Sequence, residues 1–432
     1  MRIFTIILIS LFLFSCSKNI TGIKPQDPND FDWTKDESPI YIEGKFLVPV
    51  GQTLHIEAGT VIKFQSTDDP NNNFSDEVGW IEVKGSINAI GDSEEIIQFV
   101  AESSGTWGGI VFRNSIDNYF YNCYFDDSAY AKNNINQRLV GAAIHCVDSE
   151  VNVNFCNFND SRIYSIFADS SSTILIENAS FFTCTVYQHP TSNIFVTNDS
   201  ESEFDNCDIS GYSYGMYFYH SGSARISNSD FETVLRAIHA QQLTGELEIE
   251  NNTFRNGIYL YGSGESYKVL NNSFFQSGIA IETWLSREFS IQGNLFVECN
   301  LAIKTGACLE SLEIYNSTFY NIDTCCYGDD INLFNSIIFG ENSYFQQEDN
   351  WHGQLYIEKS LIPFVDEHTT VSDCIIGEDP IFSNVNIYKP SSESPCIDYG
   401  NNYSEIILEE DLDGNVRISG DAIDLGSYEY IE

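Results

Sequence analysis

Hydrophobic and polar positions alternate in a six-residue motif that recurs along most of the chain, about every 22 residues. The motif starts with an apolar residue, usually has Asn at its third position, and ends with Phe or Ile. Clear copies are IENASF ending at Phe181, ISNSDF at Phe231, IENNTF at Phe254, VLNNSF at Phe274 and IYNSTF at Phe319. The position seven before the last residue is usually apolar too, and this alternation predicts a short β-strand with one face turned inward.

The repetition of this strand predicts a solenoid. A strand so short cannot bury its inner face alone, but stacking one repeat on the next does so. A helical solenoid would need long apolar runs at 3.6-residue spacing, which the chain lacks. We therefore predict an all-β fold: a single right-handed parallel β-helix solenoid with coils of about 22 residues, right-handed because parallel crossovers strongly prefer that hand.

The recurring asparagine lies between the two apolar positions of the motif. Asn tolerates the left-handed backbone that a sharp inward turn requires. Its amide can also bond unpaired backbone groups and other amides from coil to coil. We expect a structural ladder formed by Asn178, Asn206, Asn228, Asn251, Asn271 and Asn316, with Asn122 and Asn335 in the same register.

The first residues are typical of an export signal. Arg2 precedes an apolar run over residues 3–14, which is too short to remain in a bilayer as a spanning helix. The ending Leu13-Phe14-Ser15-Cys16 resembles a bacterial lipobox, a resemblance that implies diacylation of the Cys16 sulfur and a stable membrane anchor. The alternative is an ordinary secretory signal with a chance cysteine.

These features predict four consecutive parts. Residues 1–15 are a lipoprotein signal peptide, 16–36 a polar tether with two prolines, 37–365 the parallel β-helix, and 366–432 a C-terminal module. The predicted location is that of an exported, membrane-anchored lipoprotein at the outer membrane or cell surface.

Several segments resemble known families. The Asn ladder, the inward Phe stack and the coil length resemble the right-handed parallel β-helix of the pectate-lyase-like superfamily. The segment GKFLVPVGQTLHIEAGTVIKFQ at residues 44–65 is similar to the opening coils of secreted bacterial β-helix proteins. The stretches SPCIDYGNN at 394–402 and DLDGNVRISGDAIDLGSYEY at 411–430 resemble the choice-of-anchor Q type C-terminal module. The resemblance implies the fold, and not one activity, because this fold hosts lyases, hydrolases and adhesins.

The net charge of the chain limits the kinds of partner that it can bind. Among 432 residues, 63 Asp and Glu oppose 20 Lys and Arg, giving a net charge of −43. Nucleic acid is excluded as a partner because it needs a basic face. An acidic polysaccharide would be repelled unless a local basic cleft or bound calcium reversed the field. No Cys and His arrangement has zinc spacing, so we predict no metal site and no cofactor, with calcium left open.

Bases and aromatic residues concentrate between residues 225 and 304. The ligand-binding candidates are Arg236, Arg255, Lys268, Trp284 and Arg287, with Tyr259 and Tyr261 as further members of an aromatic strip that could stack on sugar rings. No lyase signature and no pattern of two carboxylates fixes an active site, so catalytic residues remain unassigned. A separate ladder of alternating charge, Glu203, Arg225, Glu248 and Lys268, is expected on one outer face.

The predicted function is binding of an extracellular glycan or surface partner by a monomer. One alternative is a polysaccharide lyase or glycosidase acting in a groove along the helix. A further alternative is a structural or adhesive rod.

The cysteines are predicted to be mainly buried thiols. Apart from Cys16 an odd number remains, and Cys123, Cys156 and Cys207 share a repeat position that elsewhere holds small residues. Pairing of Cys325 with Cys326, or of Cys374 with Cys396, is left open because spacing cannot decide it.

Overall fold

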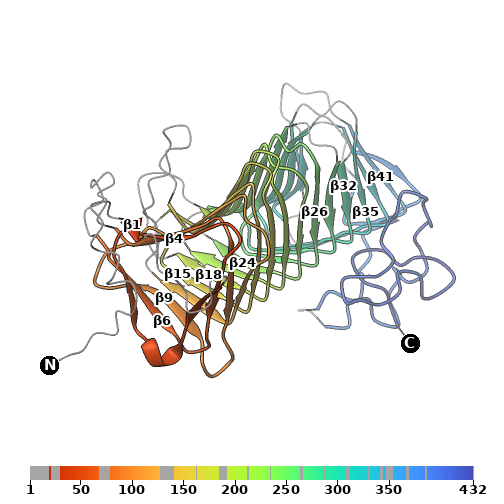
Figure 1. Cartoon of the computed structure of the whole chain (residues 1–432). Helices are drawn as coiled ribbons and strands as arrows, with labels where there is room; N and C mark the ends of the chain where they lie inside the picture. The colour runs from red at the N-terminus through yellow and green to blue at the C-terminus, as the bar shows by residue number, and fades with distance from the viewer. Residues whose placement is uncertain are drawn as a thin grey trace. The chain divides into compact units, whose positions relative to one another are not determined.

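A computed structural model describes residues 19–20, 30–67, 78–126, 141–161, 163–183, 192–211, 214–233, 235–262, 266–285, 289–306, 311–328, 330–340, 344–346, 354–365, 369–384 and 387–431. The regular structure in these residues is almost entirely β, with one short 3₁₀ helix at Lys35–Glu37. No helix within the described residues is long and apolar enough to cross a membrane. The chain divides into two compact units, Met1–Ser223 and Ala224–Glu432, and both are built in the same way (Figure 1).

Each unit is built from three parallel sheets, and every third strand of the chain belongs to the same sheet. In the first unit, sheet A contains β1 (Asn19–Ile20), β4 (Lys45–Val48), β7 (Trp80–Val83), β10 (Ile110–Arg113), β13 (Ala142–Val147), β16 (Tyr164–Asp169), β19 (Ser192–Thr197) and β22 (Tyr214–Tyr219). Sheet B contains β2 (Asp30–Trp33), β5 (Thr53–Ile56), β8 (Ser86–Ile90), β11 (Asn118–Tyr121), β14 (Glu150–Asn154), β17 (Thr173–Glu177) and β20 (Glu201–Asp205). Sheet C contains β3 (Ile40–Ile42), β6 (Val61–Phe64), β9 (Ile97–Ala101), β12 (Cys123–Asp126), β15 (Asn157–Asn159), β18 (Ser180–Thr183) and β21 (Asp208–Gly211).

The second unit repeats this order. Its sheet A strands are β25 (Arg236–Gln241), β28 (Ile258–Gly262), β31 (Ile279–Leu285), β34 (Leu301–Thr305), β37 (Thr324–Tyr327) and β40 (Tyr344–Gln346). Its sheet B strands are β23 (Ala224–Ser227), β26 (Glu246–Glu250), β29 (Ser266–Leu270), β32 (Phe289–Gln292), β35 (Leu312–Tyr315), β38 (Ile331–Phe334), β41 (Leu355–Glu358) and β43 (Thr369–Ser372). Its sheet C strands are β24 (Asp230–Thr233), β27 (Thr253–Phe254), β30 (Ser273–Phe275), β33 (Leu295–Val297), β36 (Thr318–Tyr320), β39 (Ile337–Phe339), β42 (Leu361–Ile362) and β44 (Ile375–Ile376).

The last residue of the repeated motif forms the centre of the core. In the first unit Phe125, Phe158 and Phe181 are register partners on successive strands of sheet C. Their rings are nearly parallel, with centroids 4.6 Å and 4.8 Å apart, and each side chain is buried. The spacing equals the distance between neighbouring strands, so backbone pairing and ring stacking satisfy the same geometry.

The recurring asparagines lie at the turn between sheets B and C. Asn178, Asn206, Asn228, Asn251, Asn271 and Asn316 all have left-handed φ, between 49° and 56°. In the first unit Asn206 Nδ2 donates to Asn178 Oδ1 at 2.6 Å. Phe155 takes the turn position of the coil before Asn178, so Asn178 Nδ2 donates instead to Oδ1 of Asn154, the last residue of β14, at 3.0 Å. We call this row the turn ladder.

A second amide row lies inside the second unit, at the residue after the turn ladder. Asn252, Asn272 and Asn294 are buried. Asn272 Oδ1 accepts the backbone N–H and the side-chain Nδ2 of Asn252, and Asn294 Oδ1 accepts the same two groups of Asn272. Their Nδ2 groups also donate to strand carbonyls, for example Asn294 to Val269 O at 2.7 Å. The sequence analysis missed this row, although the paired Asn in IENNTF and VLNNSF signals it.

No described cysteine forms a disulfide, and all of them except Cys374 are buried. Cys123 and Cys156 occupy the first-unit position that corresponds to the inner asparagines of the second unit. Their thiols donate to strand carbonyls, Cys156 Sγ to Asn154 O at 3.3 Å and Cys123 Sγ to Tyr121 O at 3.5 Å.

The three sheets continue to Ile376, and the described residues after it contain no strand of any sheet. Residues 387–431 form an irregular segment (blue in Figure 1), which we call the C-terminal segment. It packs on the turn side of the second unit, where Leu425 and Cys396 join the buried Ile337 and Leu361 of sheet C.

Strand β18 offers a test of the core, because its two phenylalanines point to opposite faces. Phe181 is fully buried and Phe182 is 46% exposed. We expect Phe181→Ala to lower the free energy of unfolding by about 3–5 kcal/mol, because it opens a gap in the ring stack. The matched Phe182→Ala should change it by less than about 0.5 kcal/mol. Urea unfolding of both variants measures this, and equal losses would contradict the assigned faces.

Candidate functional site

The outer face of sheet A in the second unit gathers charged and aromatic side chains. Strand pairing brings five of them into one row across successive coils. The members of this row, which we call the central row, are His239, Tyr259, Glu282, Lys304 and Tyr327. Two residues further along each strand, Gln241, Tyr261 and Trp284 form a parallel row.

Glu282 is the centre of the charged part of this face. Its side chain is only 14% exposed and lies between two cations, with Arg236 Nη2 at 3.3 Å from Oε2 and Lys304 Nζ at 3.1 Å from Oε1. Both cations are half-buried, so the pairs are more firmly held than fully exposed ones. Two positive charges against one negative charge leave this spot positive, in contrast to the chain as a whole.

Aromatic rings surround the charged trio. The Arg236 guanidinium lies 4.0 Å from the ring centroid of Tyr259, and the His239 ring packs edge-on against the same ring at 4.8 Å. Burial, together with the positive Arg236, lowers the pKa of His239 to about 4, although Glu282 acts in the opposite direction. His239 is therefore a neutral imidazole at neutral pH.

Two aromatic side chains at the edge of this face remain open to solvent. Tyr261 is 38% exposed and Trp284 is 37% exposed, and they are register partners on β28 and β31. Trp284 is seated over Gly306, where an added Cβ would lie 2.7 Å from Cε3 and Cζ3 of the indole. The absence of a side chain at residue 306 therefore leaves the space that the ring occupies.

The predicted ligand-binding residues do not all come together. Arg236 and Trp284 lie on this face of sheet A. Arg255 is exposed in the turn after β27, which belongs to sheet C, and Lys268 lies on β29 of sheet B. Arg287 lies outside the described residues. Candidates that lie close together in the sequence are thus placed on different sheets of the coil.

Lys268 belongs instead to the charge ladder on sheet B. Arg225, Glu248 and Lys268 are register partners, with Arg225 Nε at 3.0 Å from Glu248 Oε1 and Lys268 Nζ at 3.8 Å from Glu248 Oε2. Lys268 also pairs with Glu246. In the second unit this is the alternating ladder that the sequence predicted, with exposed pairs whose stabilising effect is small.

Sequence reasoning missed Glu282 and His239 as members of the site. A signal exists, because His239, Glu282, Lys304 and Tyr327 each follow the last residue of their motif copy at the same spacing. Tyr259 follows Phe254, the last residue of its motif copy, at a shorter spacing. The residues of the central row therefore do not recur at one constant interval in the sequence.

The first unit carries a related arrangement on its own sheet A. Glu82 is buried among three cations, with Arg113 Nε at 3.2 Å and Lys84 Nζ at 3.8 Å from Oε1 and with Lys45 at Oε2. Further along the row, the rings of Phe167, Phe195 and Tyr217 stack with centroids 5.2 Å and 5.1 Å apart. This stack is less exposed than the pair Tyr261 and Trp284.

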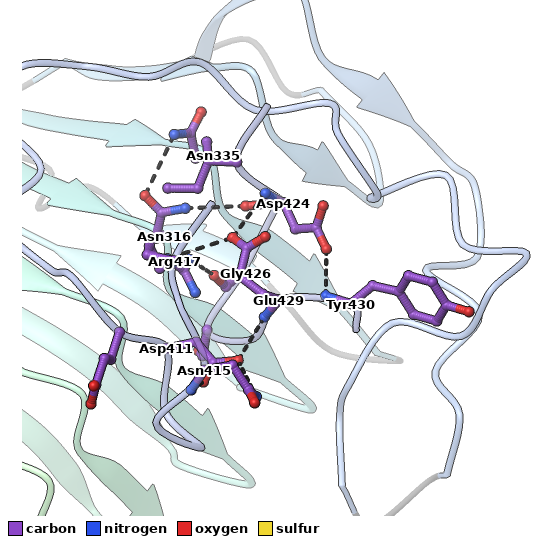
Figure 2. Close-up of polar contacts among 12 residues, drawn as sticks. Asn316, Asn335, Asp411, Asn415, Arg417, Asp424, Gly426, Glu429 and Tyr430 are labelled. Atoms are coloured by element: carbon purple, nitrogen blue, oxygen red, sulfur yellow. Dashed lines mark hydrogen bonds and ion pairs between the residues drawn. The ribbon is translucent and has the colours of Figure 1, made fainter. Parts of the chain in front are cut away.

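A second polar cluster lies inside the C-terminal segment (Figure 2). Arg417 is buried, donates through Nη2 to Gly426 O and lies 3.9 Å from Glu429 Oε1 through Nε. Glu429 Oε1 also accepts the backbone N–H of Asp424 at 3.1 Å, and Asp424 Oδ2 accepts that of Tyr430 at 2.7 Å. Burial raises the pKa of Glu429 to about 8, and the nearby Arg417 only partly offsets this.

Asp411 closes the same cluster as the first residue of a turn. Its Oδ1 accepts the backbone N–H groups of Asp413 and Asn415, and its Oδ2 accepts Asn415 Nδ2 at 3.1 Å and Glu429 N at 2.9 Å (Figure 2). These donors occupy the oxygens that a cation would need. Among the described residues, no three His, Cys, Asp or Glu side chains are placed to hold a metal ion.

Comparisons with known proteins agree on the fold. The family model for a right-handed β-helix region matches residues 142–296. Together with the strand pairing, this match confirms the predicted all-β, right-handed parallel β-helix. No curated protein matches the sequence.

The solved structures that this chain is similar to have low sequence identity to it. Tailspike protein 3 of bacteriophage CBA120 is 10% identical to this chain, with a TM-score of 0.43. The match covers 77% of this chain and 55% of the tailspike chain. The surface adhesin PfbA of Streptococcus pneumoniae is 10% identical with a TM-score of 0.40, covering 81% of this chain and 84% of its own. Pectate lyase Pel9A is 13% identical with a TM-score of 0.37, covering 88% of each chain.

The pKa of Glu429 predicts a pH effect on stability. Because burial raises this pKa from the ordinary 4.5 to about 8, the folded chain binds more protons than the unfolded chain between these values. Stability should therefore fall as pH rises from about 5 to 8. Glu429→Gln imitates the protonated carboxyl and should reduce this fall.

Thermal unfolding midpoints at pH 5 and pH 8 provide the measurement. The exposed Glu393→Gln is the matched control and should follow the unaltered chain. If the midpoint of Glu429→Gln changes with pH as much as that of the unaltered chain, Glu429 does not hold its proton in the folded chain.

Proposed function

We propose that this chain is an exported, lipid-anchored surface protein that binds a glycan on the outer face of sheet A in its second unit. The observation that carries the proposal is the pair of exposed aromatic rings, Tyr261 and Trp284, held in register beside the Arg236, Glu282 and Lys304 trio. Flat rings stack on the apolar faces of sugars, and fixed charged groups orient sugar hydroxyls.

The fixed geometry of this face supports recognition. Trp284 is held against Gly306, and Arg236 is held by Glu282 on one side and by the Tyr259 ring on the other. Such pre-ordered side chains lose little conformational freedom when a ligand binds. The local excess of positive charge also means that an acidic glycan would meet less repulsion here than elsewhere on the chain.

Binding is favoured over hydrolysis by the number of carboxylates. Glycosidases of the common kind use two, which flank the bond that they cleave. Within the described strands of sheet A from β25 to β40, Glu282 is the single carboxylate, and it is already paired with two cations.

The surface location rests on the signal at residues 1–16. Diacylation of Cys16 would anchor the chain. The predicted tether over residues 16–36 is too long, because β1 (Asn19–Ile20) and β2 (Asp30–Trp33) within it already pair with β4 and β5. Cys16 lies outside the described residues, so the anchor is supported by the lipobox-like ending alone.

Trp284→Ala tests the glycan site. On a panel of neutral and acidic polysaccharides, with and without calcium, we expect the unaltered chain to bind at least one glycan. The variant should bind it about tenfold more weakly, because a stacked ring contributes on the order of 1.4 kcal/mol. Isothermal titration calorimetry measures this loss.

Tyr119→Ala is the matched control, since Tyr119 is a 43% exposed ring on sheet B of the first unit. An equal loss for both variants, or no binding to any glycan, would contradict the site. Release of reducing ends or of unsaturated uronides would show catalysis in place of simple binding.

Cys16→Ser tests the anchor separately. Serine cannot carry the thioether-linked lipid, so we expect the variant to lose metabolic labelling with an alkyne fatty acid and to lose membrane association. Cys374→Ser is the control, because this half-buried cysteine lies far along the chain. Labelling retained in Cys16→Ser would place the lipid on another residue, and absence of label from the unaltered chain would show that it uses an ordinary secretory signal.

A further inference from the structure

The turn ladder of the second unit binds main chain as well as other amides. Asn335 makes two bonds to one residue of the C-terminal segment, with Nδ2 donating to Asn401 O at 2.8 Å and Oδ1 accepting Asn401 N at 2.9 Å. On β32, next to the ladder, Gln292 Nε2 donates to Glu405 O at 2.8 Å, and its Oε1 accepts Ile407 N at 2.9 Å. Each amide thus satisfies both a donor and an acceptor of a peptide backbone, as a neighbouring strand would.

Two further members of the ladder hold the segment through single bonds. Asn271 Nδ2 donates to Glu410 O at 3.1 Å, and Asn316 Nδ2 donates to Asp424 O at 3.1 Å (Figure 2 shows the bond of Asn316). The amides at this face of the coils therefore recognise peptide groups of a chain that lies across them.

The ladder continues beyond the part that the C-terminal segment covers. Asn251 lies one coil before Asn271, has the same left-handed φ of 56°, and is exposed. Within the described residues, no side-chain hydrogen bond involves its amide. Here the edge of the segment and the coil turns enclose a groove of about 700 Å³, lined among others by Asn251, Asn271, Glu250, Glu410 and Leu412.

One acceptor in the lining of this groove is unsatisfied. Asn271 Oδ1 is buried and has no partner in the described part of the chain. The next position of the ladder is Gly293, which has no amide to offer, and a Cβ there would overlap both this oxygen and Leu408 Cδ1. This oxygen faces Gly293 and Leu408 and is closed to a ligand, so the exposed Asn251 amide is the group of this row that a ligand can reach.

The charge of the groove specifies the ligand further. Glu250, Glu409 and Glu410 belong to its lining, and Leu412 and Tyr428 add apolar surface. Because Glu250 Oε2 already lies 3.4 Å from Arg225 Nη2, the exposed Glu409 and Glu410 carry the negative charge that a ligand would meet. We propose that this groove binds an extended peptide segment that carries lysine or arginine side chains. Its backbone would pair with the Asn251 amide as Asn401 pairs with Asn335, while its cations meet the glutamates.

A basic peptide fits these observations better than an N-acetylated sugar. The acetamido group of such a sugar offers the same N–H and C=O pair, but it carries no positive charge to meet Glu409 and Glu410. The two ligands are therefore distinguished in the test, and this site is separate from the glycan face proposed on sheet A.

The test uses the purified full chain and a fluorescein-labelled octapeptide of alternating lysine and threonine, followed by fluorescence anisotropy. We expect saturable binding that Asn251→Gly weakens about tenfold, the effect of two lost hydrogen bonds. Glycine is suited to the left-handed turn and occurs naturally at residue 293, so the variant should fold. Circular dichroism and the unfolding midpoint check this.

The controls separate the groove from the general negative charge. Glu410→Gln should weaken binding several-fold, whereas the matched Glu393→Gln, which removes an exposed glutamate of the same segment outside the groove, should not. An octapeptide of alternating glutamate and threonine should not bind.

Three results would overturn the proposal. The first is absence of saturable binding of the lysine peptide. The second is equal weakening by Glu410→Gln and Glu393→Gln together with an unchanged affinity of Asn251→Gly, which would indicate charge attraction alone. The third is tighter binding of chitotetraose than of the peptide, lost in Asn251→Gly, which would assign the groove to an acetamido glycan.

Discussion

Parallel pairing of each strand with the equivalent strand of the next coil is the constraint on which the whole structure depends. It places every side chain about 4.8 Å from the side chains one coil away, so a residue is acceptable only if it fits its own neighbours in the row. Identical flat rings satisfy this rule, and Phe125, Phe158 and Phe181 stack nearly parallel. Amides satisfy it too, because each carries both a donor and an acceptor, as in Asn252, Asn272 and Asn294.

The same constraint has the opposite consequence for charges. Like charges one coil apart repel, and two outer rows of the second unit avoid such pairs by alternating in sign or by placing a neutral ring beside a charge. Glu248 lies between Arg225 and Lys268 on sheet B, and Glu282 follows Tyr259 and precedes Lys304 on sheet A. Sequence neighbours such as Arg255 and Lys268, in contrast, point from different faces of the coil. A binding site on this fold is therefore formed by residues at equivalent positions of successive coils. Residues that are merely close together in the sequence do not form one.

This difference explains what the sequence could predict. The Phe stack and the turn ladder were readable because Phe and Asn recur there at a fixed place in the motif, whereas the buried row of Asn252, Asn272 and Asn294 was missed. The central row was not readable, because His239, Tyr259, Glu282 and Lys304 share no residue type, and the shorter turn before Tyr259 shifts the count. The contribution of Gly306 could not be read either, since it acts by leaving space for the Trp284 ring of another coil. The contacts of the C-terminal segment join residues 66 positions apart in the case of Asn335 and Asn401 and 108 apart in the case of Asn316 and Asp424, which no local pattern encodes.

The turn ladder shows how one repeated residue can serve two purposes. In the first unit its amides bond each other, as Asn206 does with Asn178, whereas in the second unit Asn271, Asn316 and Asn335 turn to the C-terminal segment. A strictly regular ladder would offer the same surface at every coil and could not fix where the segment binds. Gly293 breaks that regularity, because the space of its missing side chain receives Leu408 and gives the segment one register. The irregular copy IQGNLF is therefore the part of the repeat that carries positional information, and the cost is the unsatisfied oxygen of Asn271 beside it.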